Sequence, residues 1–135
     1  MRTVLTVAGL GVLLVLAGTA QVFGHHSFAG EFDINRPIEL TGTVSKVEWI
    51  NPHAWIHVDV KKRDGTIETW AIETGTPNTL LRRGLRKQDL PAGTEVKVSG
   101  YQARDGTAKA NGTNVTLPDG RALLIGSTGA GAPTK

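Results

Sequence analysis

The stretch TVSKVEWINPHAWIHVDV, residues 43–60, carries the strongest structural signal in this sequence. In its second half the side chains alternate, with Ile56, Val58 and Val60 on one face and Trp55, His57 and Asp59 on the other. A period of two is typical of a half-buried strand. Pro52 interrupts the pattern, because proline lacks an N–H group and restricts the residue before it. The stretch therefore predicts two strands that meet at an Asn51-Pro52 corner.

Similar strand patterns lie on both sides of this pair. Gly42, in the middle of the first strand, predicts a bulge or a sharp coil. The inward-facing positions predict a shared core of Val44, Ile56, Val58, Val96 and Val98. The predicted strands cover residues 38–50, 54–61, 66–73, 94–103, 113–117 and 121–125.

The period changes between the third and fourth strands, where residues 76–84 predict a short helix. Thr76 suits the N-cap, Pro77 the first helical position and Gly84 the left-handed position after the helix. Its apolar side chains are expected to close over one end of the sheet: Leu80, Leu81 and Leu85.

Four basic residues gather at the end of this helix: Arg82, Arg83, Arg86 and Lys87. Cations are favourable there because of the helix dipole, so we expect a solvated helix end. The alternative is an anion-binding patch.

The order of three strands, one helix and further strands predicts an all-β domain with one short helix. A small OB-like Greek-key barrel of five to six strands has this order, with its helix between strands three and four. A plain β-sandwich or meander is the alternative.

The first 24 residues have the form of a signal peptide, with Arg2, a short apolar run and then small residues. Cleavage fits after Ala20 or after Gly24, and an uncleaved anchor is the alternative. The predicted organisation is a signal peptide over 1–24, an N-terminal arm over 25–36, the barrel over 37–125 and a disordered tail over 126–135. We therefore expect a periplasmic or secreted protein that is not stably inserted in a membrane once the signal is removed.

Composition narrows the classes of function. The chain has no cysteine, so an exported domain must be held together by its core alone. Without Arg2 the chain keeps 14 basic residues against 12 acidic ones. This charge is too balanced to indicate nucleic-acid binding, so we expect no nucleic-acid partner.

Several separated motifs together resemble a known family. They are HHSFAGEFD at 25–33, GTV at 42–44, VEW at 47–49, NPHAW at 51–55, LLRRG at 80–84 and GYQARDG at 100–106. This pattern resembles the exported bacterial family catalogued as domain of unknown function 6152, over about residues 25–123. The resemblance implies a small secreted bacterial domain with no assigned activity.

Histidine is the residue type that could carry chemistry in this chain. Cleavage after Gly24 would give His25 a free α-amine beside its imidazole, and His26 or His53 could supply another nitrogen. Nitrogen-rich sites of this kind suit Cu(II), followed by Zn(II) and Ni(II). His53 and His57 would be about 13 Å apart along a straight strand, so they share a site only if the corner bends the chain. The alternative is that His25, His26 and His53 serve structure alone.

The tryptophans offer a second candidate surface. Trp49 and Trp55, with His57 and Trp70, could form a platform on which a sugar ring or a peptide stacks. In a small barrel such residues could equally belong to the core.

Catalysis has little support in the sequence. No cysteine is present, and no serine lies in a Gly-x-Ser-x-Gly turn. We therefore expect a non-enzymatic binding module, with a carbohydrate- or peptide-binding OB module as the alternative.

Overall fold

The structure is a computed structural model that describes residues 28–127. The mostly β architecture with short helices, predicted from the sequence, is confirmed. In chain order the elements are α2 (Phe28–Glu31), β1 (Phe32–Glu48), β2 (Trp55–Lys61), β3 (Ile67–Glu73), α3 (Pro77–Arg82), the 3-10 helix η1 (Lys87–Asp89), β4 (Glu95–Ala103), β5 (Lys109–Thr116) and β6 (Ala122–Leu124).

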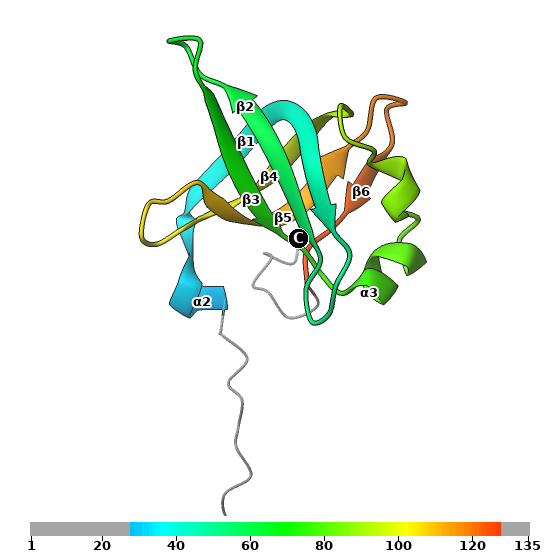
Figure 1. Ribbon diagram of the computed structural model, residues 1–135. Coiled ribbons are helices and arrows are strands. Elements are labelled where there is room, and N and C mark those ends of the chain that lie inside the picture. Colours follow the sequence, from blue (N-terminus) through cyan, green and yellow to red (C-terminus); the bar gives the residue numbers. More distant parts are fainter. Residues whose placement is uncertain (1–27, 128–135) are drawn as a thin grey trace, which may run out of the picture.

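The six strands form one sheet in the order β3-β2-β1-β4-β5-β6. The long strand β1 pairs antiparallel with β2 through its second half and with β4 through its first half. Figure 1 shows β1 arching across the sheet between these two partners. β3 also pairs in parallel with β5, from Ala71–Lys109 to Glu73–Asn111. Hydrogen bonds therefore run in a closed ring through β1, β2, β3, β5 and β4.

Gly42 allows β1 to change partners. A Cβ atom at this position would lie 2.3 Å from the carbonyl oxygen of Asp59 and 2.8 Å from Cγ1 of Val58. Only glycine lets β1 cross β2 this closely. The register shift between the two strands follows soon after, between Val44 and Lys46.

Two strands begin earlier than the sequence predicts. β1 begins at Phe32 rather than at Ile38, and β5 begins at Lys109 rather than at Thr113. The start of β5 is rich in small residues, which are poor strand formers by propensity. The interior requires small residues here, because a Cβ atom on Gly112 would lie 2.7 Å from both Ile125 and Ile72.

The predicted core is confirmed, and it fills the interior of the ring. Val44, Ile56, Val58, Val96 and Val98 are all buried in one cluster. From the helical region Leu80 and Leu85 join this cluster, but the prediction for Leu81 was wrong, because its side chain is 47% exposed. Leu81 follows Leu80 directly on the short helix α3, so it points away from the face that Leu80 buries.

The helix α3 has the predicted caps. The Thr76 side chain accepts a hydrogen bond from the Thr79 amide at 3.1 Å, and Pro77 opens the helix. Gly84 has a φ of +89°, the left-handed conformation that glycine tolerates best.

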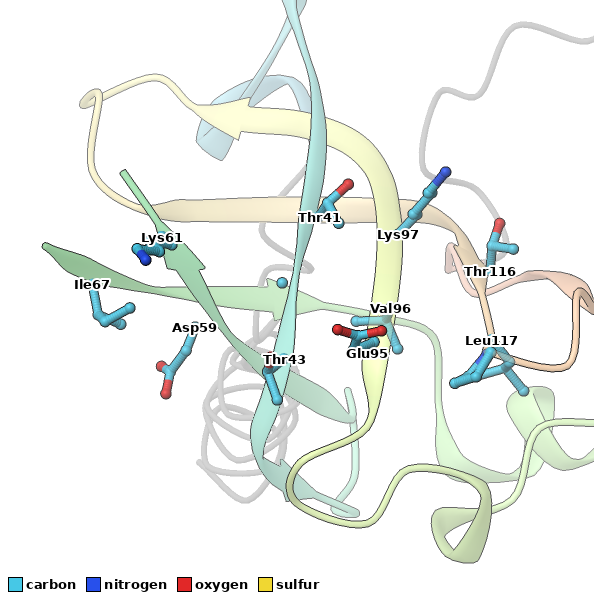
Figure 2. Close-up of a pocket in the computed structure, with 12 residues that line it drawn as sticks. Thr41, Thr43, Asp59, Lys61, Ile67, Glu95, Val96, Lys97, Thr116 and Leu117 are labelled. Carbon is cyan, nitrogen blue, oxygen red and sulfur yellow. The ribbon is translucent and has the colours of Figure 1, made fainter. Parts of the chain in front are cut away.

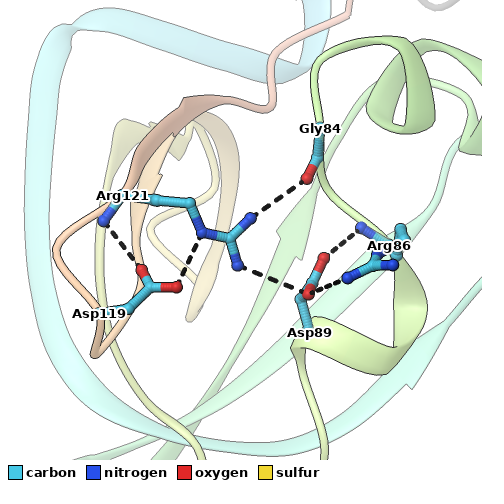
Figure 3. Close-up of polar contacts among 5 residues, drawn as sticks. All are labelled: Gly84, Arg86, Asp89, Asp119 and Arg121. Carbon is cyan, nitrogen blue, oxygen red and sulfur yellow. Dashed lines mark hydrogen bonds and ion pairs between the residues drawn. The ribbon is translucent and has the colours of Figure 1, made fainter.

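The basic cluster after α3 is partly paired (Figure 3). Arg86 donates its backbone N–H and its guanidinium to Asp89, whose side chain is only 10% exposed. Arg121 bridges Asp119, at 2.8 Å, and Asp89, at 3.5 Å. These contacts join η1 to the β5–β6 hairpin, while Arg82 and Lys87 remain exposed. The expected solvated helix end is therefore seen for these two residues.

The predicted signal peptide and most of the predicted tail lie outside the described residues. Within residues 28–127, no helix has the length and apolar character needed to cross a membrane.

Candidate functional site

The histidines predicted to bind metal are only partly visible. His25 and His26 lie outside the described residues. His53 lies in the corner just before β2, and His57 lies on the outward face of that strand.

The ring of His53 is held in one orientation. Its Nδ1 lies 2.9 Å from the carbonyl oxygen of Thr74 and 3.9 Å from Oε1 of Glu73. A carbonyl oxygen can only accept, so Nδ1 carries the proton and donates. The lone pair of the neutral ring then lies on Nε2. A histidine that ligates a metal commonly donates its other N–H group to a carbonyl in this way.

Glu73 differs from the other carboxyl groups with a shifted pKa in residues 28–127, because its pKa is raised whereas theirs are lowered. Burial raises the pKa of Glu73 above its ordinary value, and the nearby charge of Glu31 raises it further. The charges of His53 and Lys109 and a hydrogen bond from Asn111 act in the opposite direction. The Asn111 amide donates to Oε1 of Glu73 at 3.5 Å.

The N-terminal arm contacts the body of the domain at this same place. Glu31, the last residue of α2, forms an ion pair with Lys109 on β5. The ammonium of Lys109 also lies over the rings of Phe32, at 5.7 Å, and Trp55, at 5.9 Å. Arg104 fastens the helix, since its Nε donates to the Ala29 carbonyl at 2.6 Å. The arm therefore enters the domain beside Glu73 and His53.

His57 belongs to a separate polar group. Its Nε2 donates to Oε2 of Glu48 at 2.7 Å, and Lys46 donates to the other oxygen of Glu48 at 3.0 Å. The hydrogen bond from His57, followed by that from Lys46, lowers the pKa of Glu48 below its ordinary value.

The three tryptophans do not form one platform. Trp70 is buried in the core, and its indole N–H donates to Glu68 at 3.0 Å. Trp49 packs against the core cluster and is half-buried. Trp55 is the one on the outward face of β2, and the Lys109 ammonium covers part of its ring.

Residues 28–127 contain no group of three or more His, Cys, Asp or Glu side chains arranged to hold a metal ion. Among these residues, His53 therefore does not belong to such a group. Sequence reasoning missed Glu31, Glu73, Lys109 and Asn111 in this region. They come from three distant segments, and no local pattern marks them.

A groove of about 790 Å³ lies on another part of the sheet (Figure 2). Asp59, Lys61 and Ile67 lie on one side of it, and Glu95, Lys97 and Leu117 on the other. Thr41 and Thr43 of β1 lie between the two sides. None of the histidines and tryptophans in the described part of the chain lines this groove, so it is distinct from the places of His53, His57 and Trp55.

Comparison with known proteins identifies a family over most of the chain. A family model described as a family of unknown function (DUF6152) matches residues 12–114. The resemblance that the sequence motifs indicate is thereby confirmed. No curated protein matches the chain. No solved structure matches it either.

Proposed function

The chain belongs to DUF6152, a family of unknown function, and we therefore propose from its own geometry that it is an exported, non-enzymatic module that binds Cu(II) through His25, His26 and His53. The observation that carries the proposal is the orientation of His53. Its Nδ1–H is engaged by Thr74, and its Nε2 keeps a lone pair. The side chain is 35% exposed, so an ion can reach it.

Chain geometry supports the choice of partners for His53. His26 and His25 precede Phe28 by two and three residues, a span of at most about 7 and 10 Å. The arm enters the domain where Glu31 influences Glu73, and Glu73 lies 3.9 Å from the His53 ring. Glu73 places a carboxylate beside the N–H side of that ring, as the groups that orient a ligating histidine commonly do. Cu(II) is the strongest binder of nitrogen sites among the divalent first-row metals.

Export forms part of the proposal. Cleavage after Gly24 would make His25 the first residue and place its α-amine in the site. Intact mass of the protein recovered from the periplasm or the medium determines where cleavage occurs. Recovery of the full-length chain from the cytoplasm or the membrane would contradict export.

Calorimetric titration of the processed protein with Cu(II) tests the site. His53→Ala should weaken binding by at least the roughly 10- to 100-fold that follows from losing a group that only orients a metal ligand. The double variant His25→Ala, His26→Ala should weaken it more. His57→Ala is the matched control, because His57 of β2 is hydrogen-bonded to Glu48 of β1 in a separate polar group, and this variant should bind as wild type does.

Binding should also weaken as the pH is lowered, because protons compete with the metal for imidazole nitrogen. Equal copper uptake by the double variant and wild type would refute the histidine site.

We further propose that the ring of strands is an OB-type barrel. Support comes from β1 pairing with both β2 and β4, from the parallel β3–β5 contact that completes the ring, and from α3 between β3 and β4.

The second candidate function is carbohydrate or peptide binding on the outward face of β2. Its support is the placement of Trp55 and His57 on the same face of that strand, near Trp49. Quenching or enhancement of tryptophan fluorescence by an oligosaccharide, lost in Trp55→Ala, would favour it. Trp70 cannot take part in this surface, because it is buried.

A further inference from the structure

Arg83 is held in place by two backbone carbonyl groups. It follows α3 directly and is half-buried. Its Nη1 donates to the carbonyl oxygens of Leu124, at 3.4 Å, and of Gly126. Both acceptors belong to the segment at the end of β6, so the guanidinium is anchored from one side.

The other side of the guanidinium has no partner within residues 28–127. A guanidinium has five N–H donors, and the two carbonyl groups account for those on Nη1. Neither Nε nor Nη2 makes a hydrogen bond, and no carboxylate forms an ion pair with Arg83, among the described residues. Arg86 and Arg121 differ in this respect, since both contact Asp89. The Nε–Nη2 edge is one that binds a carboxylate through two parallel hydrogen bonds.

Arg83 lines a small pocket of about 140 Å³. This volume equals roughly that of five water molecules in the liquid. Phe28 from α2, Tyr101 from β4 and Leu124 from β6 supply apolar walls, and Asn111 and Thr113 from β5 supply polar ones. The ring of Phe28 is fixed there, edge-on to Tyr101 at a centroid distance of 5.7 Å. The pocket therefore combines a cation with room for a few carbon atoms.

We propose that this pocket binds a small carboxylate. Its two oxygens pair with the Nε–Nη2 edge of Arg83, and its short apolar part lies against Phe28, Tyr101 and Leu124. The carboxylate is that of a free short-chain acid or that of the C-terminal residue of a peptide. The site uses none of the histidines of the copper proposal, so the two proposals stand or fall separately.

The probe for this site is propionate, added to the isotope-labelled processed protein and followed by NMR. Propionate should produce saturable shifts at the Arg83 Nε–H and at the backbone amides of Thr113 and Leu124. Propionamide has nearly the same shape but no charge, and it should produce no saturable shift at these positions. This comparison needs no substitution, so it holds even if a variant fails to fold.

Substitutions then assign the effect to one side chain. Arg83→Gln should weaken propionate binding by about tenfold or more, because it removes a charge-assisted pair. Arg83→Lys keeps the charge and one donor for Gly126 but has no planar fork, and it should weaken binding similarly. Arg82→Gln is the matched control. It removes the same charge from the preceding, exposed residue, and binding should not change.

A short acetylated peptide, with either a free or an amidated C-terminus, separates the two sources of the carboxylate. Tighter binding of the peptide acid than of propionate assigns the pocket to a peptide end, and weaker binding assigns it to a free acid. The proposal is overturned if propionate gives no saturable shift, if propionamide shifts the same resonances equally, or if Arg83→Gln binds as wild type does.

Discussion

The substitution Gly42→Ala tests the crossing of β1 over β2 directly. The added Cβ atom would lie 2.3 Å from the Asp59 carbonyl oxygen, whereas ordinary contacts begin at 3.4 Å. The backbones of β1 and β2 must therefore separate by about 1.1 Å, the difference between these two distances. The obstructing atom is part of a paired backbone, so no side-chain rotation can relieve the contact.

We expect this variant to lose unfolding free energy at or above the upper end of the range of about 1–3 kcal/mol that is typical of overpacked interiors. The loss is a net value, because alanine also stiffens the unfolded chain and thereby returns about 0.4–1 kcal/mol. Urea unfolding followed by circular dichroism measures the difference. Hydrogen exchange at the Thr43 and Asp59 amides shows whether the weakening is local.

Gly126→Ala provides the control for this experiment. It makes the same chemical change where the nearest neighbour would be 3.3 Å away, at the Gly112 carbonyl oxygen, and it should cost less than about 1 kcal/mol. If Gly42→Ala unfolds within about 0.5 kcal/mol of wild type, the strands do not cross at the separation described here.

Five further substitutions probe the core, the buried carboxyl and the network of Figure 3. Val58 is fully buried, so Val58→Ala should lower the unfolding free energy by about 1–3 kcal/mol. Val58→Asp should leave no folded protein by circular dichroism, because it would bury a lone charge. If Val58→Asp melts as wild type does, the side chain at this position is not buried. Glu73→Gln should raise the melting temperature at neutral pH, since burial raises the pKa of Glu73 and ionisation therefore costs wild type stability. That advantage should shrink as the pH falls through the raised pKa and disappear below the ordinary value of 4.5, so a gain independent of pH would exclude this cause. Asp89→Ala should cost about 0.5–2 kcal/mol of unfolding free energy in urea, as the loss of a capping residue does. Asp119→Ala should cost less, because the Asp119 side chain is exposed. Equal losses would show that the cap formed by Asp89 adds no stability.

The local structure was largely predictable because each element carries its own signal. Alternation identified the outward Trp55 and His57 and the inward Ile56 and Val58, and the caps at Thr76 and Gly84 bounded the helix. The early start of β5 was not predictable from propensity. Its small residues reflect crowding by Ile72 and Ile125, which only the closed ring brings to Gly112.

The sites were less accessible to sequence reasoning, because they are made by contacts between distant segments. Glu31, Glu73 and Lys109 meet only where the arm, β3 and β5 come together. The donor at Nδ1 of His53 depends on the Thr74 carbonyl, which no motif reveals. The Arg83 pocket needs side chains from α2, β4, β5 and β6 at once. The sequence placed Arg83 in a basic cluster, but nothing in the sequence distinguished Arg83 from Arg82.

The small pocket beside Arg83 also determines how this domain can be joined to other chains. Phe28 and Ser127, the first and last described residues, both line it, so the two ends of the domain are neighbours. The tip of the β2–β3 hairpin projects from the opposite side of the molecule from α2 (Figure 1). A circular permutant could therefore join the two ends by a short linker and begin and end between Asp64 and Gly65, in the β2–β3 turn. It would keep every strand pairing intact. Because its two ends lie close together, the whole domain could also be inserted into a single surface loop of a host protein.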